Sequence, residues 1–196
     1  MSNGDRKVCV YCGSSRQCDA AYREAANQLG GVLARNGFAV VYGGGKVGSM
    51  GAVAEGVLAA GGRIVGIIPE FMMDLEWNHP NLTANVVVKD MHERKRRMLQ
   101  GSQAAIALPG GCGTMEELLE AITWKRLGLY CGAIVVVNTK NYFQPLLEML
   151  EKSVTENFMD PRHQRMWAVV RQPDEVPGAI QSAAPWSADC QKFAVL

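Results

Sequence analysis

Glycine-rich turns follow three apolar runs of the chain and are the first features that could do chemistry. They are Gly13-Ser14-Ser15, Gly43-Gly44-Gly45 and Pro109-Gly110-Gly111-Cys112-Gly113-Thr114. Glycine lets backbone N–H groups approach an anion without a Cβ in the way, and a helix N-terminus behind each turn adds partial positive charge. One such turn often serves only tight turning or helix packing, but three together predict a cradle for a nucleotide or a sugar phosphate.

The second turn differs from two well-known nucleotide motifs. Its pattern at 43–51, G-G-G-K-V-G-S-M-G, only superficially resembles the dinucleotide fingerprint, and the next strand ends in Pro69-Glu70 rather than in a clear ribose-binding carboxylate. Its lysine follows the glycines directly, which does not match the pattern G-x-x-x-x-G-K-[ST]. Binding of NAD and P-loop hydrolysis of ATP are therefore disfavoured.

A basic segment and an acidic pair accompany the third turn. Residues 91–98 should form a helix after Asp90, a good N-cap residue, and four consecutive cations in it would spread around the helix axis. One or two of them can point at the strand ends, although a wholly solvated basic face is the alternative. Glu116 and Glu117 fall in the first turn of the next helix, where they could simply stabilise its N-terminus. Beside a glycine cradle and the Thr114 hydroxyl, however, a carboxylate one turn later predicts an active site.

The elements that must position these residues alternate between strands and helices. Segment 20–37 has helical spacing with Gly37 as its stop, and a weaker helix is expected around 174–184. Continuous apolar strands predict a parallel sheet covered on both faces. The predicted fold class is α/β, a Rossmann-like doubly wound sheet that binds ligands beyond the carboxyl ends of its strands. About seven strands are expected, at 8–12, 38–43, 63–69, 85–90, 104–110, 133–138 and 166–170.

Size, charge and composition restrict the kind of protein. The 196 residues are 48% hydrophobic and show no repeat or linker, so a single domain over 1–196 is expected. A net charge of only +1 gives no global attraction to nucleic acid or to an anionic membrane. Without a signal peptide or an apolar run of about 20 residues, we expect a cytoplasmic protein with reduced cysteines.

Two further segments invite a functional interpretation. Cys9 and Cys12 form a C-x-x-C, but residues three apart in a strand face opposite sides, and the histidines are scattered, so no metal site is predicted. The segment 71–85 is longer than an ordinary strand-to-helix loop and contains Glu76 and His79. It is a candidate lid or interface element.

Three motifs together resemble the LONELY GUY family. They are Gly-Gly-Gly-x-x-Gly-x-Met-Gly at 43–51, Met-His-x-Arg-Lys at 91–95 and Pro-Gly-Gly-x-Gly-Thr-x-Glu-Glu at 109–117. The similarity runs from about residue 7 to 158, in the family's order and spacing. It implies a phosphoribohydrolase that needs no metal or cofactor, releases a free cytokinin base and ribose 5-phosphate from a cytokinin riboside 5′-monophosphate, and forms a homodimer.

The resemblance also implies which residues act. It assigns the catalytic pair to Arg94 and Glu117, and substrate contacts to Lys95, to Thr123 and, less securely, to Glu76. The predicted substrate site is completed by the glycine turns and the residues that follow them: Gly13, Ser14, Gly44, Gly45, Gly110, Gly111, Cys112, Gly113, Thr114, Met115 and Glu116. Met91, Met98 and Met115 could line a base pocket, although core packing is the default for methionine.

Cleavage of a ribosyl C1′–N bond builds positive charge on the sugar, which a carboxylate can stabilise. Our hypothesis is that Glu117 does this and activates water, while Arg94 holds the ribose or the phosphate and fixes Glu117 as a carboxylate through a charge-assisted contact. A non-catalytic nucleotide or cofactor carrier with the same cradle is the alternative. A lysine decarboxylase is disfavoured, because no pyridoxal-phosphate lysine with its supporting acid is recognisable.

Overall fold

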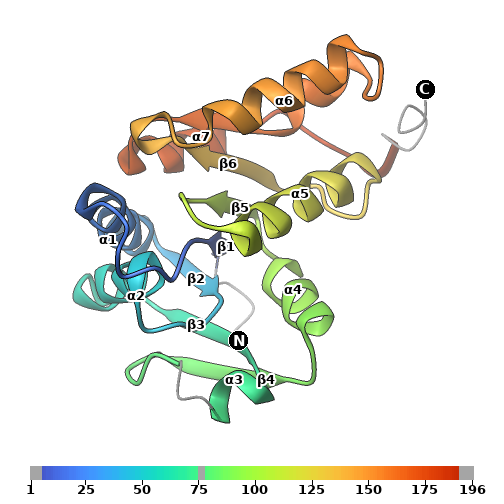
Figure 1. Cartoon of the computed structure of the whole chain (residues 1–196). Coiled ribbons are helices and arrows are strands. Elements are labelled where there is room, and N and C mark those ends of the chain that lie inside the picture. The colour runs from blue at the N-terminus through green and yellow to red at the C-terminus, as the bar shows by residue number, and fades with distance from the viewer. Residues whose placement is uncertain (1–5, 75–77, 190–196) are drawn as a thin grey trace.

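A seven-stranded parallel sheet forms the centre of the protein (Figure 1). This computed structural model describes residues 6–74 and 78–189. The strands lie in the order β4-β3-β2-β1-β5-β6-β7, and each one falls close to its predicted run, so the predicted fold class is confirmed. Their bounds are β1 Arg6–Tyr11, β2 Phe38–Tyr42, β3 Ile64–Pro69, β4 Ala84–Val88, β5 Ala104–Ala107, β6 Ala133–Val137 and β7 Ala168–Val170.

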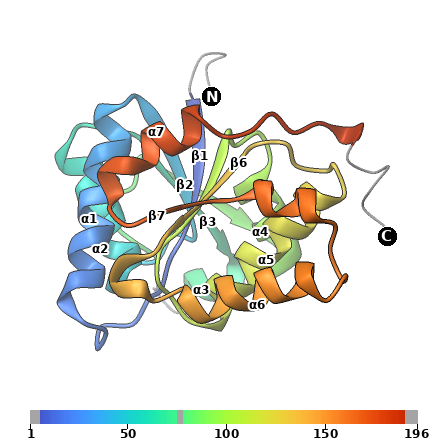
Figure 2. The ribbon, with the colours of Figure 1, turned by 90° about the horizontal axis from the view of Figure 1, so that it is seen from above.

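Helices cover both faces of the sheet and separate two hydrophobic cores (Figure 2). One face carries α1 Ala20–Arg35, α2 Gly48–Ala59 and α7 Val176–Gln181. The other face carries α4 Met91–Leu99, α5 Cys112–Arg126 and α6 Gln144–Thr155. Shorter helical turns complete the chain: α3 Glu70–Asp74, η1 Thr139–Asn141, η2 Pro161–Met166 and η3 Pro173–Glu175. Because both faces are covered, β3 and β6 are buried along their whole length.

The helix boundaries follow local sequence signals. The Asp90 carboxylate accepts a hydrogen bond from the N–H of Glu93 at 2.8 Å and so caps α4 as predicted. Gly37 lies just beyond α1 with a φ of 73°, a conformation that glycine adopts without steric cost. Cys9 and Cys12 pack into opposite cores, as their spacing predicted, and burial raises the pKa of both free thiols.

The strand order reverses between β1 and β5, and this reversal positions the site. From β1 the chain moves outward through β2 and β3 to β4, and α4 then carries it back to β5 on the other side of β1. Helices that diverge at such a point leave a crevice beyond the carboxyl ends of the two strands. The glycine turns after β1, β2 and β5 all open toward this edge of the sheet.

The described residues of the segment 71–85 contact other parts of the chain. The segment begins within α3, and its later part is pinned to the second glycine turn by an antiparallel bridge between Gly45 and Asn78. The N–H of His79 also donates to the carbonyl of Gly44 at 2.9 Å. Glu76 lies outside the described residues.

Within the part of the chain that the structure describes, no helix combines the length and apolar content needed to cross a bilayer. The same residues contain no group of three or more His, Cys, Asp or Glu side chains able to hold a metal ion.

Candidate active site

Backbone contacts bring the three glycine turns together. The N–H of Gly13 donates to the carbonyl of Pro109 at 3.3 Å, and the carbonyl of Gly13 accepts from the N–H of Met50 in α2 at 3.1 Å. A Cβ on Gly13 would lie 3.0 Å from the Cα of Gly110, so these two turns need glycine in order to meet. The turn after β1 is thus joined to the turn after β5 and to the start of α2.

The glycines of the turns serve different purposes. Gly44 has a φ of 79°, and an added Cβ would lie 2.3 Å from the Ile68 side chain, so this glycine is required for turning and packing. By contrast, no described atom comes within 4 Å of a Cβ added to Gly111 or Gly113. Gly111 is the N-cap residue of α5, where backbone N–H groups and the helix dipole favour an anion. The third turn is therefore the one that leaves room for a phosphate.

The crevice consists of three adjoining pockets. One of about 180 Å³ lies at the N-terminus of α5 and is lined by Arg94, Thr114 and Glu117, among others. A second, of about 350 Å³, lies beside the glycine turn after β2, and a third, of about 300 Å³, lies between Gly110 and Tyr142. Ser14 lines all three pockets, and Arg94 lines the first two. One extended ligand could therefore contact the cradle and both charged residues.

Arg94 is held in place by the ends of two strands. Its side chain is buried, its Nε donates to the carbonyl of Ile67 at 3.1 Å, and its Nη2 donates to the carbonyl of Gly43 at 3.3 Å. An added Cβ at Gly43 would lie 2.1 Å from Nη2, so this glycine makes room for the guanidinium. Nη1 lies 3.8 Å from Oε1 of Glu117. The guanidinium is thus fixed with one edge toward the carboxylate.

Glu117 is buried opposite Arg94, on the side of α5 that faces the sheet. Burial raises the pKa of its carboxyl to about 7, although the neighbouring Arg94 acts in the opposite direction. Arg94 favours the ionised carboxylate, as the hypothesis has it, but the desolvation of Glu117 outweighs this attraction, so the pair does not hold Glu117 as a permanent carboxylate. A carboxyl that titrates near neutrality can accept and return a proton at physiological pH.

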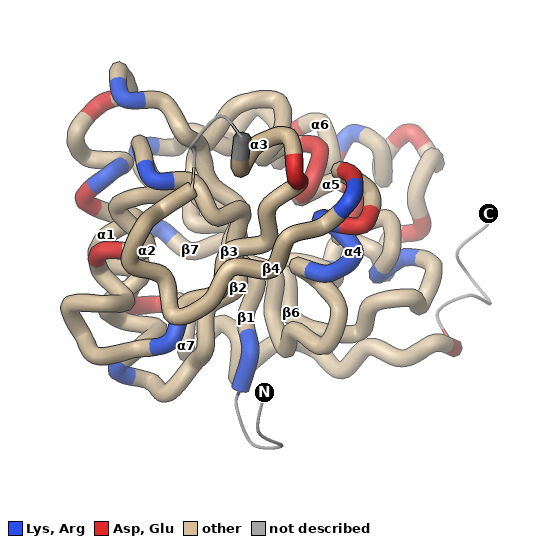
Figure 3. The backbone as a smooth tube through the Cα atoms, turned by 90° about the horizontal axis from the view of Figure 1, so that it is seen from below, with Lys and Arg blue, Asp and Glu red and all other residues tan. Residues whose placement is uncertain are grey.

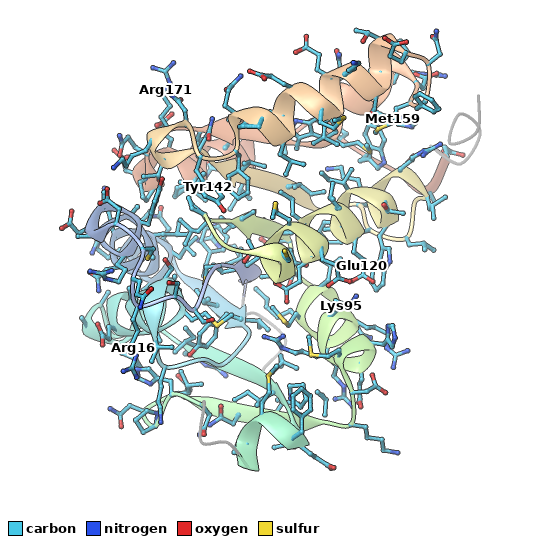
Figure 4. The ribbon with its side chains drawn as sticks, viewed as in Figure 1. Arg16, Lys95, Glu120, Tyr142, Met159 and Arg171 are labelled. Carbon is cyan, nitrogen blue, oxygen red and sulfur yellow. The ribbon has the colours of Figure 1, made fainter. Side chains whose placement is uncertain are left out.

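Lys95 faces α5 instead of the crevice. Its ammonium donates to Glu116 and lies 3.3 Å from Oε1 of Glu120. Figure 3 shows the basic stretch of α4 next to acidic positions of α5, and in Figure 4 Lys95 and Glu120 point toward one another. Burial lowers the pKa of Lys95, but the hydrogen bonds to the two glutamates outweigh burial and leave it raised. Lys95 does not line any of the three pockets.

Several other predicted contacts also lie away from the crevice of the described chain. Thr123 is exposed on α5, and its hydroxyl donates to the carbonyl of Leu119 at 2.8 Å, about 13 Å along the helix from Thr114. Cys112 is exposed and Met115 half-buried, and neither lines the three pockets. The remaining described residues of the predicted substrate set each line at least one pocket: Gly13, Ser14, Gly44, Gly45, Gly110, Gly111, Gly113, Thr114 and Glu116.

The methionines divide between pocket and core. Met91 lines the pocket at the start of α5, whereas Met98 is fully buried in the core below α4. Met50, which the sequence did not single out, lines two of the pockets from α2. Its position in the G-S-M-G stretch, soon after the second glycine turn, could have indicated that Met50 lies near the site.

Two polar residues of the site were also missed. The hydroxyl of Tyr142, which follows η1, donates to the carbonyl of Gly110 at 2.6 Å, and its ring packs edge-on against Tyr22. Figure 4 labels Tyr142 and Arg16. Arg16, in the loop after β1, lines the pocket of about 350 Å³. Arg16 stands directly after the first glycine-serine turn, which could have indicated it, but no local pattern connects Tyr142 to the cradle.

Known proteins resemble this chain in both sequence and fold. Residues 50–180 match a family model described as "possible lysine decarboxylase". A rice protein named probable cytokinin riboside 5′-monophosphate phosphoribohydrolase LOGL2 is 39% identical over 92% of this chain and 74% of its own length. The cytokinin riboside 5′-monophosphate phosphoribohydrolase LOG3 of Arabidopsis thaliana is 38% identical over 92% of this chain and 84% of its own length.

Solved structures of lower sequence similarity share the fold. The molybdenum cofactor carrier protein of Chlamydomonas reinhardtii is 19% identical, with a TM-score of 0.70 over 92% of this chain and 98% of its own. The molybdenum cofactor binding protein of Rippkaea orientalis is 20% identical, with a TM-score of 0.68 over the same shares. The family, in contrast, is shown by the sequence relatives: the chain belongs to the LONELY GUY (LOG) family of cytokinin riboside 5′-monophosphate phosphoribohydrolases.

Proposed function

We propose that this protein cleaves the N-glycosidic bond of cytokinin riboside 5′-monophosphates, giving the free base and ribose 5-phosphate. Its substrates are N6-substituted AMP and, as a second candidate, AMP itself. The observation that carries the proposal is the buried pair of Arg94 and Glu117, whose side chains lie 3.8 Å apart in a pocket at the N-terminus of α5. Relatives of the chain at 38% to 44% identity carry the name of this activity.

The 5′-phosphate binds at the start of α5. Gly111 and Gly113 leave their backbone N–H groups accessible there, and Thr114 adds a hydroxyl to the same pocket. Phosphate bound at this point contributes binding energy remote from the bond that breaks, and that energy positions the sugar. A requirement for the monophosphate over the free riboside follows from this arrangement.

The sugar and the base then extend from the cradle toward β2 and β3. Arg94 separates the pocket at α5 from the pocket of about 350 Å³, so a nucleotide that spans both places its ribose beside the Arg94–Glu117 pair. The larger pocket has apolar side chains on its wall, which suit a purine with an apolar N6 substituent. These side chains are Val47, Met50, Ile68 and Met72.

The reaction requires one water molecule and one carboxylate. The C1′–N bond breaks with its electron pair going to the base, and the oxygen of water forms the new bond to C1′. Glu117 in its ionised form takes the proton of that water and then gives it up to the departing nitrogen, so that the carboxylate is restored at the end of the reaction. Arg94 stays charged throughout and holds the carboxylate toward the sugar.

The test is release of base and ribose 5-phosphate from isopentenyl-AMP, AMP and isopentenyladenosine. We expect release from the monophosphates and not from the riboside. Glu117→Gln should abolish it, whereas Glu151→Gln, an exposed position on α6, should leave it unchanged. Binding of the monophosphates without any release would contradict the proposal and favour a nucleotide or cofactor carrier.

We further propose that the protein is a homodimer that uses the exposed face of α5. Leu119, Thr123 and Leu127 recur every four residues and therefore share one face of that helix, and all three are exposed. Exposed leucines on one helix face favour association with a partner. Thr123 would then lie within the interface between the two chains.

Replacing Leu119 with glutamate tests this assembly. Light scattering should show a monomer for Leu119→Glu and a dimer for the wild type. If residues such as Glu76 or Thr123 complete the partner's site, the folded monomer should lose activity. A fully active monomer would show that each chain has a complete site.

A further inference from the structure

Two neighbouring cations of α4 each contact carboxylates of α5, Arg94 at one point and Lys95 at another. On α4, Arg94 points toward the strand ends and Glu117, and Lys95, one residue later, points toward α5. On α5, Glu116 and Glu120 lie four residues apart on one face, and Glu117 lies between them on the side of the sheet. The first contact lies in the proposed reaction centre, and the second lies directly beside it.

Lys95 has the burial and the contacts of a fixed structural charge. The side chain is only 9% exposed, whereas that of Glu116 is 57% exposed and that of Glu120 is 29% exposed. Its ammonium contacts both carboxylates at once, whereas the ammonium of a freely solvated lysine is surrounded by water. A buried ammonium without these partners would be costly, and two glutamates four residues apart would repel each other without the ammonium.

We propose that Lys95 is a positioning residue, which bridges Glu116 and Glu120 so that α4 and α5 hold Arg94 opposite Glu117, and which shields Glu117 from the two flanking carboxylates. This proposal rests on the proposed function only for its effect on catalysis. The effect on Glu117 itself belongs to the folded protein and can be measured without substrate.

The charges around Glu117 determine the direction of the effect. Burial raises the pKa of Glu117; Arg94 and Lys95 of α4 lower it, while Glu116 and Glu120 of α5 raise it. From β1, three buried groups on the two faces of the sheet interact electrostatically with Glu117, but they remain neutral because burial raises their own pKa values. They are the side chains of Cys9, Tyr11 and Cys12. Loss of Lys95 should therefore raise the pKa of Glu117, and loss of Glu120 should lower it.

Carboxyl-carbon NMR of selectively labelled glutamate, titrated with pH, measures this directly in the full chain. The signal of Glu117 is assigned from its absence in Glu117→Gln. We expect the titration midpoint of Glu117 to move up by about one pH unit in Lys95→Met, down in Glu120→Gln, and back toward the wild type in the double variant. Arg97→Met is the matched control, because Arg97 lies on α4 but pairs with Glu93 of its own helix.

Turnover then separates positioning from substrate binding. If Lys95 acts through Glu117, Lys95→Met should lower kcat and shift its pH profile upward with little change in KM, and Lys95→Arg should restore part of the rate. A large rise in KM with an unmoved Glu117 titration would instead make Lys95 a substrate contact and overturn the proposal. Should Lys95→Met fail to fold, an unmoved titration in Glu120→Gln would overturn it equally. If the wild type releases no base while the titrations shift as expected, the proposed function fails and the role of Lys95 stands.

Discussion

Replacing Glu117 with glutamine should change how the stability of the protein depends on pH. Burial raises the pKa of this carboxyl from an ordinary value of 4.5 to about 7 in the folded state. The folded protein thus holds the proton more tightly than the unfolded chain, so the contribution to stability is complete below pH 4.5 and is lost as the pH rises through 7. The shift of about 2.5 pKa units corresponds to about 3 kcal/mol in the free energy of unfolding.

The assay is urea unfolding of wild type and Glu117→Gln at several values between about pH 4.5 and pH 8. The attraction between Arg94 and Glu117 acts only on the ionised carboxylate, so it is already contained in the pKa of about 7. The glutamine side chain does not titrate, so the variant has no such pH-dependent contribution at this position. The difference between the two proteins should therefore move by about 3 kcal/mol in favour of the variant as the pH rises. Glu151→Gln, on the exposed side of α6, should show no such trend. A difference that stays constant across the range would refute the assignment of a raised pKa to Glu117.

Four further substitutions separate the roles of neighbouring residues at the cradle. Gly110→Ala should destabilise the protein by about 2 kcal/mol in urea unfolding, because the new Cβ would lie 2.2 Å from the hydroxyl oxygen of Thr114. Gly111→Ala has space and should leave stability unchanged while raising KM about tenfold, since the methyl group occupies the proposed phosphate site. Tyr142→Phe removes the hydrogen bond to the Gly110 carbonyl and should raise KM about fivefold with kcat unchanged. Arg94→Lys should lower kcat about a hundredfold in steady-state assays, because lysine cannot contact two carbonyls and a carboxylate in this geometry.

The sequence predicted the fold well because the relevant signals are local. Apolar, β-branched runs such as those of β3 and β6 are continuous because both faces of the sheet are covered, and that pattern distinguishes a parallel sheet from an exposed antiparallel one. The start of α4 and the end of α1 were predictable because each is set by a residue next to the helix end, Asp90 for α4 and Gly37 for α1. The segment 71–85 was predicted less well, because its hydrogen bonds are made with the distant turn at 43–45.

The functional site was predictable only where sequence neighbours share a motif. The motif context predicted Arg94 and Glu117 as a pair, and the structure places them 3.8 Å apart. The helical spread of the four cations predicted that only one or two would point inward, and in the structure Arg96 and Arg97 are exposed. The motif context does not indicate how α4 is rotated about its own axis. In the structure this rotation turns Lys95 toward α5 rather than into the crevice. The raised pKa of Glu117 could not be predicted from the sequence either, because it depends on how completely the surrounding elements exclude water.

A glycine cradle on this fold does not by itself distinguish a hydrolase from a carrier, since a protein named as a cofactor carrier shares the architecture at 19% identity. In the proposed mechanism Glu117 makes the distinction, because a carboxyl with a pKa of about 7 can take a proton from water, a step that a carrier does not need. The same reasoning predicts that Glu117→Gln converts the enzyme into a carrier-like protein. Calorimetry should show AMP bound with an affinity within about tenfold of the wild-type value, and chromatography should show the nucleotide intact. If the variant loses binding together with turnover, Glu117 serves to hold the nucleotide, and the argument from its pKa to its chemistry fails.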